Sequence, residues 1–189
     1  MQASILQIFL VMFLGLDVSA QLTANMIVWQ EDNVCEDGPS ASCSDLGPNT
    51  CCEFGSFGGT CMIFAPTFSD TSGAVGGAWK TDGDNQCGDL LDAADAFVCI
   101  CPNGEPEITG TSWEQDGVLR RRTGQLSACT TTVKPDIYSY KQNGTRWVLR
   151  KQDQPEVVAQ IEAGLESGAV SREDITQTII QLGAVGLDP

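Results

Sequence analysis

The chain has 189 residues, of which 25 are Asp or Glu and 10 are Lys or Arg, and it contains no histidine. The missing histidine excludes Ser-His-Asp and Cys-His nucleophile systems as well as histidine-ligated zinc or copper. The sequence also lacks a P-loop, a dinucleotide fingerprint and a GxSxG motif. We therefore expect no cofactor, no metal site and no recognised catalytic residue.

An apolar leader opens the chain. Ala3–Leu16 is apolar apart from Gln7, and the small residues up to Ala20 suit a signal peptidase. This pattern predicts a signal peptide over residues 1–20, cleaved after Ala20; the alternative is a buried N-terminal helix. The leader is shorter than the about 20 apolar residues that span a bilayer. We expect a secreted, extracellular protein with no membrane span.

Cysteines are concentrated in one window of the chain. The disulfide candidates are Cys35, Cys43, Cys51, Cys52, Cys61, Cys87, Cys99 and Cys101. Exported chains oxidise, so these residues predict a structural disulfide framework rather than metal ligation. Adjacent Cys51 and Cys52 need different partners, and strand alternation puts Cys99 and Cys101 on one face, from which they close two bridges to a neighbouring segment. Cys129 is a free thiol, a link to another chain, or a partner that frees one of the eight.

Charge divides the chain into two parts. Residues 21–119 hold sixteen acids and one base, Lys80, whereas residues 120–189 hold nine bases and eight acids. This asymmetry predicts an acidic cysteine-rich domain (21–119), a basic linker (120–135) and a C-terminal unit (136–189). The acidic part repels nucleic acid and anionic membranes, and it serves solubility or a cationic partner. The basic run ending at Arg122 is a candidate processing site or an ordinary basic strand end.

The acidic domain is predicted to be a small all-β sandwich or barrel-like domain. Expected strands are Ala24–Gln30, Gly59–Phe64, Gly73–Trp79 and Phe97–Ile100, with one helical turn at Leu90–Phe97. Turn-forming residues occupy 36–39, 46–49 and 82–85. The last of these lacks the glycine and acidic residue of an EF-hand loop, which favours an acidic turn over a calcium site.

The segment from Ile27 to Phe64 resembles fungal small secreted cysteine-rich proteins. The matching features are Trp29, the cysteines Cys35 and Cys43, the Cys51-Cys52 doublet and the strand from Gly58 to Phe64. Some proteins of this kind have folds similar to βγ-crystallins, so the resemblance implies a crystallin-like N-terminal domain. The calcium signature of crystallins is missing, so calcium binding is not implied.

The C-terminal unit is predicted to be a small α+β unit, a β-hairpin plus two helices. Segments 136–142 and 145–150 flank Asn143-Gly144, the favoured dipeptide of a tight hairpin turn. One helix is expected from Pro155 to about Ser167 with Asp153 as its N-cap, and a second, opened by a capping box at residues 171–174, to about Leu182. Asn143 also begins the chain's N-x-[ST] sequon, which makes it a glycosylation candidate.

Three functions fit these patterns. The first is a secreted, non-enzymatic, disulfide-rich effector, toxin or binding module whose partner is an extracellular protein or carbohydrate. The second is a carboxylate-based polysaccharide hydrolase, with Trp29, Trp79 or Trp113 as a sugar platform. The third is a protease inhibitor that presents a disulfide-locked loop.

Overall fold

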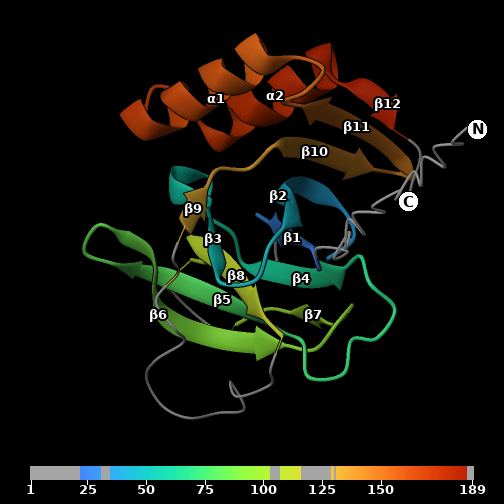
Figure 1. The fold of residues 1–189 in the computed structure, drawn as a ribbon. Coiled ribbons are helices and arrows are strands. Elements are labelled where there is room, and N and C mark those ends of the chain that lie inside the picture. The colour runs from blue at the N-terminus through green and yellow to red at the C-terminus, as the bar shows by residue number, and fades with distance from the viewer. Residues whose placement is uncertain (1–21, 31–34, 103–106, 116–128, 130, 187–189) are drawn as a thin grey trace, which may run out of the picture.

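The structure is a computed structural model that describes residues 22–30, 35–102, 107–115, 129 and 131–186. The predicted leader (1–20) and Arg122 lie outside the described residues. The fold class is confirmed: the chain is mostly β-structure in two sheets, joined by disulfides, with two C-terminal helices (Figure 1).

A seven-stranded sheet forms one layer. Its strands lie in the order β12-β11-β10-β2-β1-β4-β7 and pair antiparallel. Their bounds are β1 (Ala24–Trp29), β2 (Gly38–Leu46), β4 (Cys61–Pro66), β7 (Cys99–Ile100), β10 (Ile137–Gln142), β11 (Thr145–Arg150) and β12 (Ala184–Gly186). The predicted hairpin, β10–β11, therefore does not form a sheet of its own, because β10 pairs with β2 and extends the sheet of the cysteine-rich part.

A five-stranded sheet packs against part of the first. Its order is β6-β5-β8-β3-β9, and only the β3–β9 pair is parallel. Its strands are β3 (Thr50–Glu53), β5 (Val75–Asp82), β6 (Asn85–Ala94), β8 (Gly110–Glu114) and β9 (Thr131–Val133), and a short 3₁₀ helix, η1 (Gly55–Phe57), follows β3. The helical turn expected at Leu90–Phe97 is wrong, because Leu90 belongs to β6 and pairs with Trp79 of β5.

The two sheets meet over a core of large side chains. Phe64 of β4 stacks on Trp113 of β8 with 5.8 Å between ring centroids, and the Trp113 indole N–H donates to the Leu46 carbonyl at 2.7 Å. Gly76 of β5 permits this approach, because a Cβ there would lie 2.4 Å from the Phe64 Cβ. Glycine weakens an isolated strand, but at position 76 the close packing of the two sheets leaves no room for a side chain.

Helices α1 (Pro155–Ser167) and α2 (Arg172–Leu182) cover β10 and β11 (Figure 1). Their buried residues, Val158, Ile161, Leu165, Ile175 and Ile179, join the main core. The expected capping box of α2 is present between Ser171 and Asp174. The N-cap of α1 is Gln154 without a side-chain cap bond, so the assignment of Asp153 is wrong. Pro155 at the first position still starts this helix, since its ring fixes a helical φ.

Candidate functional site

A cleft of about 450 Å³ opens where the five-stranded sheet meets α1. One wall comes from the cysteine-rich part, where Glu53 ends β3 and Gln86 lies near the start of β6. The opposite wall comes from the C-terminal part, with Lys134 ahead of β10 and Glu162 and Glu166 one turn apart on α1. The cleft forms because α1 packs against η1, which brings together residues distant in the sequence.

Lys134 is the cation at the centre of this charge cluster. Its ammonium donates a hydrogen bond to, and forms an ion pair with, the Glu166 carboxylate. That bond, together with the attraction of Glu166, Glu162 and Glu53, raises the pKa of Lys134 above its usual value. Three carboxylates thus act on the Lys134 ammonium, and one of them, Glu162, is also paired with Lys151, so these five groups carry a net charge of −1. Such a cluster attracts a further cation.

Glu162 is more deeply buried than Glu166. Its side chain is only 14 % exposed, and it accepts a bond of 3.0 Å from the Lys151 ammonium at the end of β11. Glu166 is 63 % exposed and faces solvent. The cleft therefore combines a mostly buried carboxylate with an exposed one.

Tyr138 of β10 forms the floor of the cleft. Its ring is 1 % exposed and packs edge-on against Phe57 of η1, with 5.8 Å between centroids. Burial, followed by the charge of Glu162, raises the pKa of Tyr138 above its ordinary value. The phenol of Tyr138 therefore keeps its proton to a higher pH than an exposed tyrosine does.

The disulfide framework is confirmed, since the eight predicted cysteines form four bridges. The pairs are Cys35–Cys99, Cys43–Cys52, Cys51–Cys87 and Cys61–Cys101. Adjacent Cys51 and Cys52 reach different partners, as expected. Cys43 of β2 and Cys52 of β3 belong to different sheets, so their fully buried bridge joins the two layers.

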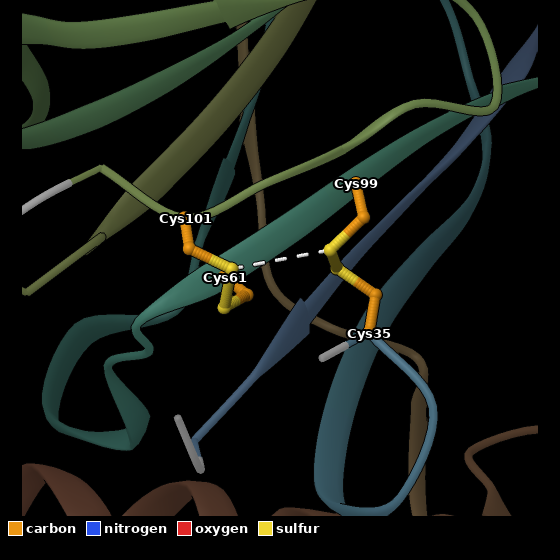
Figure 2. A group of neighbouring side chains, drawn as sticks. All are labelled: Cys35, Cys61, Cys99 and Cys101. Carbon is orange, nitrogen blue, oxygen red and sulfur yellow. Dashed lines mark hydrogen bonds between the residues drawn. A yellow bond between two sulfur atoms is a disulfide. The ribbon is translucent and has the colours of Figure 1, made fainter. Parts of the chain in front are cut away.

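Two bridges meet around β7. Figure 2 shows Cys99 and Cys101 reaching from one segment to Cys35 and Cys61, and the sulfurs of Cys99 and Cys101 lie 3.9 Å apart. The partners lie on two segments rather than the single one expected: Cys61 is the first residue of β4, and Cys35 lies between β1 and β2. The pair of bridges therefore holds β7 at its first residue and at the residue that follows it.

Cys129 is a free thiol in the structure and is half-buried. Its sulfur and those of the Cys51–Cys87 bridge all lie within 4.8 Å of one another. Burial raises the pKa of the Cys129 thiol, while a hydrogen bond with Ser112 lowers it. The raised pKa keeps the thiol protonated and slows its attack on the neighbouring bridge.

A tight turn after β6 exposes two apolar side chains. Val98 N–H donates to the Asp95 carbonyl at 3.2 Å, and Phe97 at the third position has φ +61°. Phe97 is 64 % exposed and Val98 47 % exposed. A left-handed φ costs a bulky residue about 1–3 kcal/mol, and such strain clusters at functional positions. The expected strand at Phe97–Ile100 therefore begins only at Cys99.

The tryptophans proposed as a sugar platform are not available. Trp29, Trp79 and Trp113 are 8 %, 4 % and 0 % exposed, so each belongs to the interior. No sequence motif marks the residues that line the cleft. The only local signal was the spacing of Glu162 and Glu166, which places both on one face of the predicted helix.

Asn143 lies where the sequon predicted, at the exposed turn between β10 and β11 with φ +51°. Its glycosylation remains a prediction. Among the described residues, no helix has the length and apolar character needed to cross a membrane.

One family model matches the chain. The model of the ARB_05566_N family, described as an N-terminal domain, matches residues 25–136, more than half of the chain. The chain belongs to this family. The ARB_05566_N segment contains all four disulfides and ends just before β10, so the hairpin and both helices follow it. No curated protein matches the chain, and neither does any solved structure.

Proposed function

We propose that this protein is a secreted, non-enzymatic binding module of the small cysteine-rich fungal type, whose acidic cleft holds a cationic group of an extracellular partner protein. The observation that carries the proposal is the cleft itself, whose lining holds three carboxylates, Glu53, Glu162 and Glu166, and one ammonium, that of Lys134. Secretion is supported by the apolar leader and by four disulfides, which persist in oxidising compartments.

The ion pairs in the cleft favour binding over catalysis. A carboxylate-based hydrolase needs one protonated carboxyl as general acid, which requires an apolar or like-charged environment. Glu162 and Glu166 are instead each paired with a lysine, Lys151 and Lys134 respectively. The polysaccharide hydrolase is thus the less favoured alternative.

The exposed turn disfavours the protease-inhibitor alternative. A protease cleft takes its ligand as an extended segment whose backbone hydrogen-bonds to the enzyme. Here the backbone around Phe97 is folded into a turn, with its N–H groups bonded to Phe64 and Asp95. This segment would have to unfold before it fitted such a cleft.

Lys134 occupies the position that a ligand's ammonium would take, so it acts as an internal competitor. Removing it should strengthen the binding of a cationic probe. A partly exposed ion pair is worth about 0.2–1 kcal/mol, so Lys134→Met should tighten binding up to about fivefold.

Titration of a trilysine peptide into the full secreted protein tests the proposal by calorimetry. Lys80→Met is the matched control, because Lys80 is a surface lysine paired with Asp89 outside the cleft and its loss changes net charge equally. Glu166→Gln should weaken binding, whereas Glu156→Gln on the same helix should not. If Lys134→Met and Lys80→Met change the affinity equally, and Glu166→Gln and Glu156→Gln do too, the peptide responds to net charge alone and the cleft is not its binding site. If the protein releases reducing ends from any member of a polysaccharide panel, and the Glu162→Gln variant does not, the hydrolase alternative is favoured.

A further inference from the structure

The turn Asp95–Val98 is a rigid projection. Ala94, the last residue of β6, is buried, and on the other side Cys99 is fixed by its bridge to Cys35. Between these anchors, Phe97 N–H donates to the Phe64 carbonyl at 2.8 Å and Val98 N–H closes the turn. The backbone that carries both apolar side chains is therefore held in one conformation before any contact with a partner.

Phe97, at the third position of the turn, destabilises the fold. A turn with φ above zero at this position favours glycine or asparagine, and a bulky side chain there is an outlier. Phe97 gains little packing in return, because its side chain is 64 % exposed. Phe97 weakens the isolated chain, which points to a role outside it.

We infer that Phe97 and Val98 anchor the protein in an apolar pocket on a basic partner protein. Aromatic side chains held rigidly at a surface are typical binding anchors, since little conformational freedom is lost when they are buried. The fixed backbone of the turn supplies this pre-organisation.

Charge identifies the partner as basic. Asp92 and Asp95 are exposed beside the apolar pair, and Lys80 is the one base among residues 21–119. An anionic membrane would be repelled by this surface, and so would a second copy of the chain, whose formal net charge is −15. A pocket rimmed by Lys or Arg complements both the apolar tip and its acidic surroundings.

This anchor is distinct from the acidic cleft. Gln86 lines the cleft, and the turn follows Ala94 at the far end of the same strand, on the order of 25 Å away. Either site can fail without the other, so the two proposals are tested separately.

Photocrosslinking identifies the partner. The full protein carrying p-benzoylphenylalanine at position 97 is irradiated in the fluid into which the chain is secreted, and the same analogue at Leu182, which is 48 % exposed at the end of α2 and does not line the cleft, is the control. A crosslinked protein specific to position 97 is identified by mass spectrometry and purified, and its affinity is measured with unlabelled protein. No crosslink beyond that of the control overturns the inference.

Phe97→Gly provides the quantitative test, because glycine adopts this φ without strain and the variant should fold at least as stably as the parent. Loss of a buried aromatic anchor should weaken binding to the identified partner by about tenfold to a hundredfold, whereas Leu182→Ala should have no effect. An unchanged affinity, or a partner of net negative charge, overturns the inference. So does Phe97-dependent binding to phosphatidylcholine–phosphatidylserine vesicles, or Phe97-dependent self-association in sedimentation.

Discussion

Replacing Tyr138 by alanine should destabilise both halves of the molecule together. Tyr138 lies on β10, pairs with Ala41 of β2 on one side and Leu149 of β11 on the other, and packs on Phe57. Its ring is 1 % exposed, so the substitution leaves a cavity at the junction between the cysteine-rich part and the C-terminal part.

The expected loss follows from core truncations of aromatic residues, which cost about 3–5 kcal/mol. For a domain of this size each kcal/mol corresponds to roughly 2–4 °C, so the melting temperature should fall by about 6–20 °C. Tyr140→Ala is the matched control, because Tyr140 lies on the same face of β10 but is only half-buried and stacks on Trp147. Its loss should cost distinctly less.

Urea unfolding followed by two signals is the assay. Far-UV circular dichroism at 222 nm reports α1 and α2, whereas three of the four tryptophans that give the fluorescence signal, Trp29, Trp79 and Trp113, belong to the cysteine-rich part. Both signals should shift to lower urea by the same amount and keep a common midpoint. Loss of the helical signal alone, with the fluorescence midpoint unchanged, would refute the reasoning, because the two parts would then unfold independently.

Three further outcomes are expected. Because burial raises the pKa of Tyr138 above 10.0, its phenol ionises first in the unfolded chain, so the free energy of unfolding should fall as pH rises above about 10. Urea titrations over a pH series should show a shallower fall in the Tyr138→Phe variant. An identical slope in the parent and the variant would contradict the raised pKa of Tyr138. Ser171→Ala removes the N-cap of α2 and should cost about 1 kcal/mol. The Ser171 side chain lowers the pKa of Asp174. The stabilisation from this contact should therefore be fully present above the usual carboxyl pKa and be lost as pH falls through the lowered pKa of Asp174. A Ser171→Ala variant as stable as the parent at pH 7 would argue against the cap. Complete reduction should abolish the near-UV circular dichroism of Trp79 and Trp113, because each disulfide contributes on the order of 2–5 kcal/mol, comparable with the stability of a whole domain. A retained signal would mean that the two sheets stay folded without their disulfides.

Local signals predicted the C-terminal elements well. The Asn143-Gly144 turn fixes a two-residue hairpin, and Pro155 and the Ser171–Asp174 box mark the starts of both helices. These signals act within a few residues of chain, so they are legible without tertiary structure.

Tertiary contacts determined what the sequence did not predict. β2 carries small polar residues in place of apolar alternation, and Ser40 and Ser42 are buried because neighbouring strands cover them on both sides. Residues Leu90–Ala94 favour a helix locally, but pairing with β5 overrides that preference. The pairing of β10 with β2 and the assembly of the cleft join distant segments, for which no local pattern exists.

Peptide mapping of the secreted protein without reduction, combined with its intact mass, tests most directly whether this chain is an exported protein held by these four bridges. The predicted result is Gln21 as the first residue, bridges Cys35–Cys99, Cys43–Cys52, Cys51–Cys87 and Cys61–Cys101, and Cys129 as a free thiol. A retained leader, a different set of bridges or reduced cysteines in that set would contradict it.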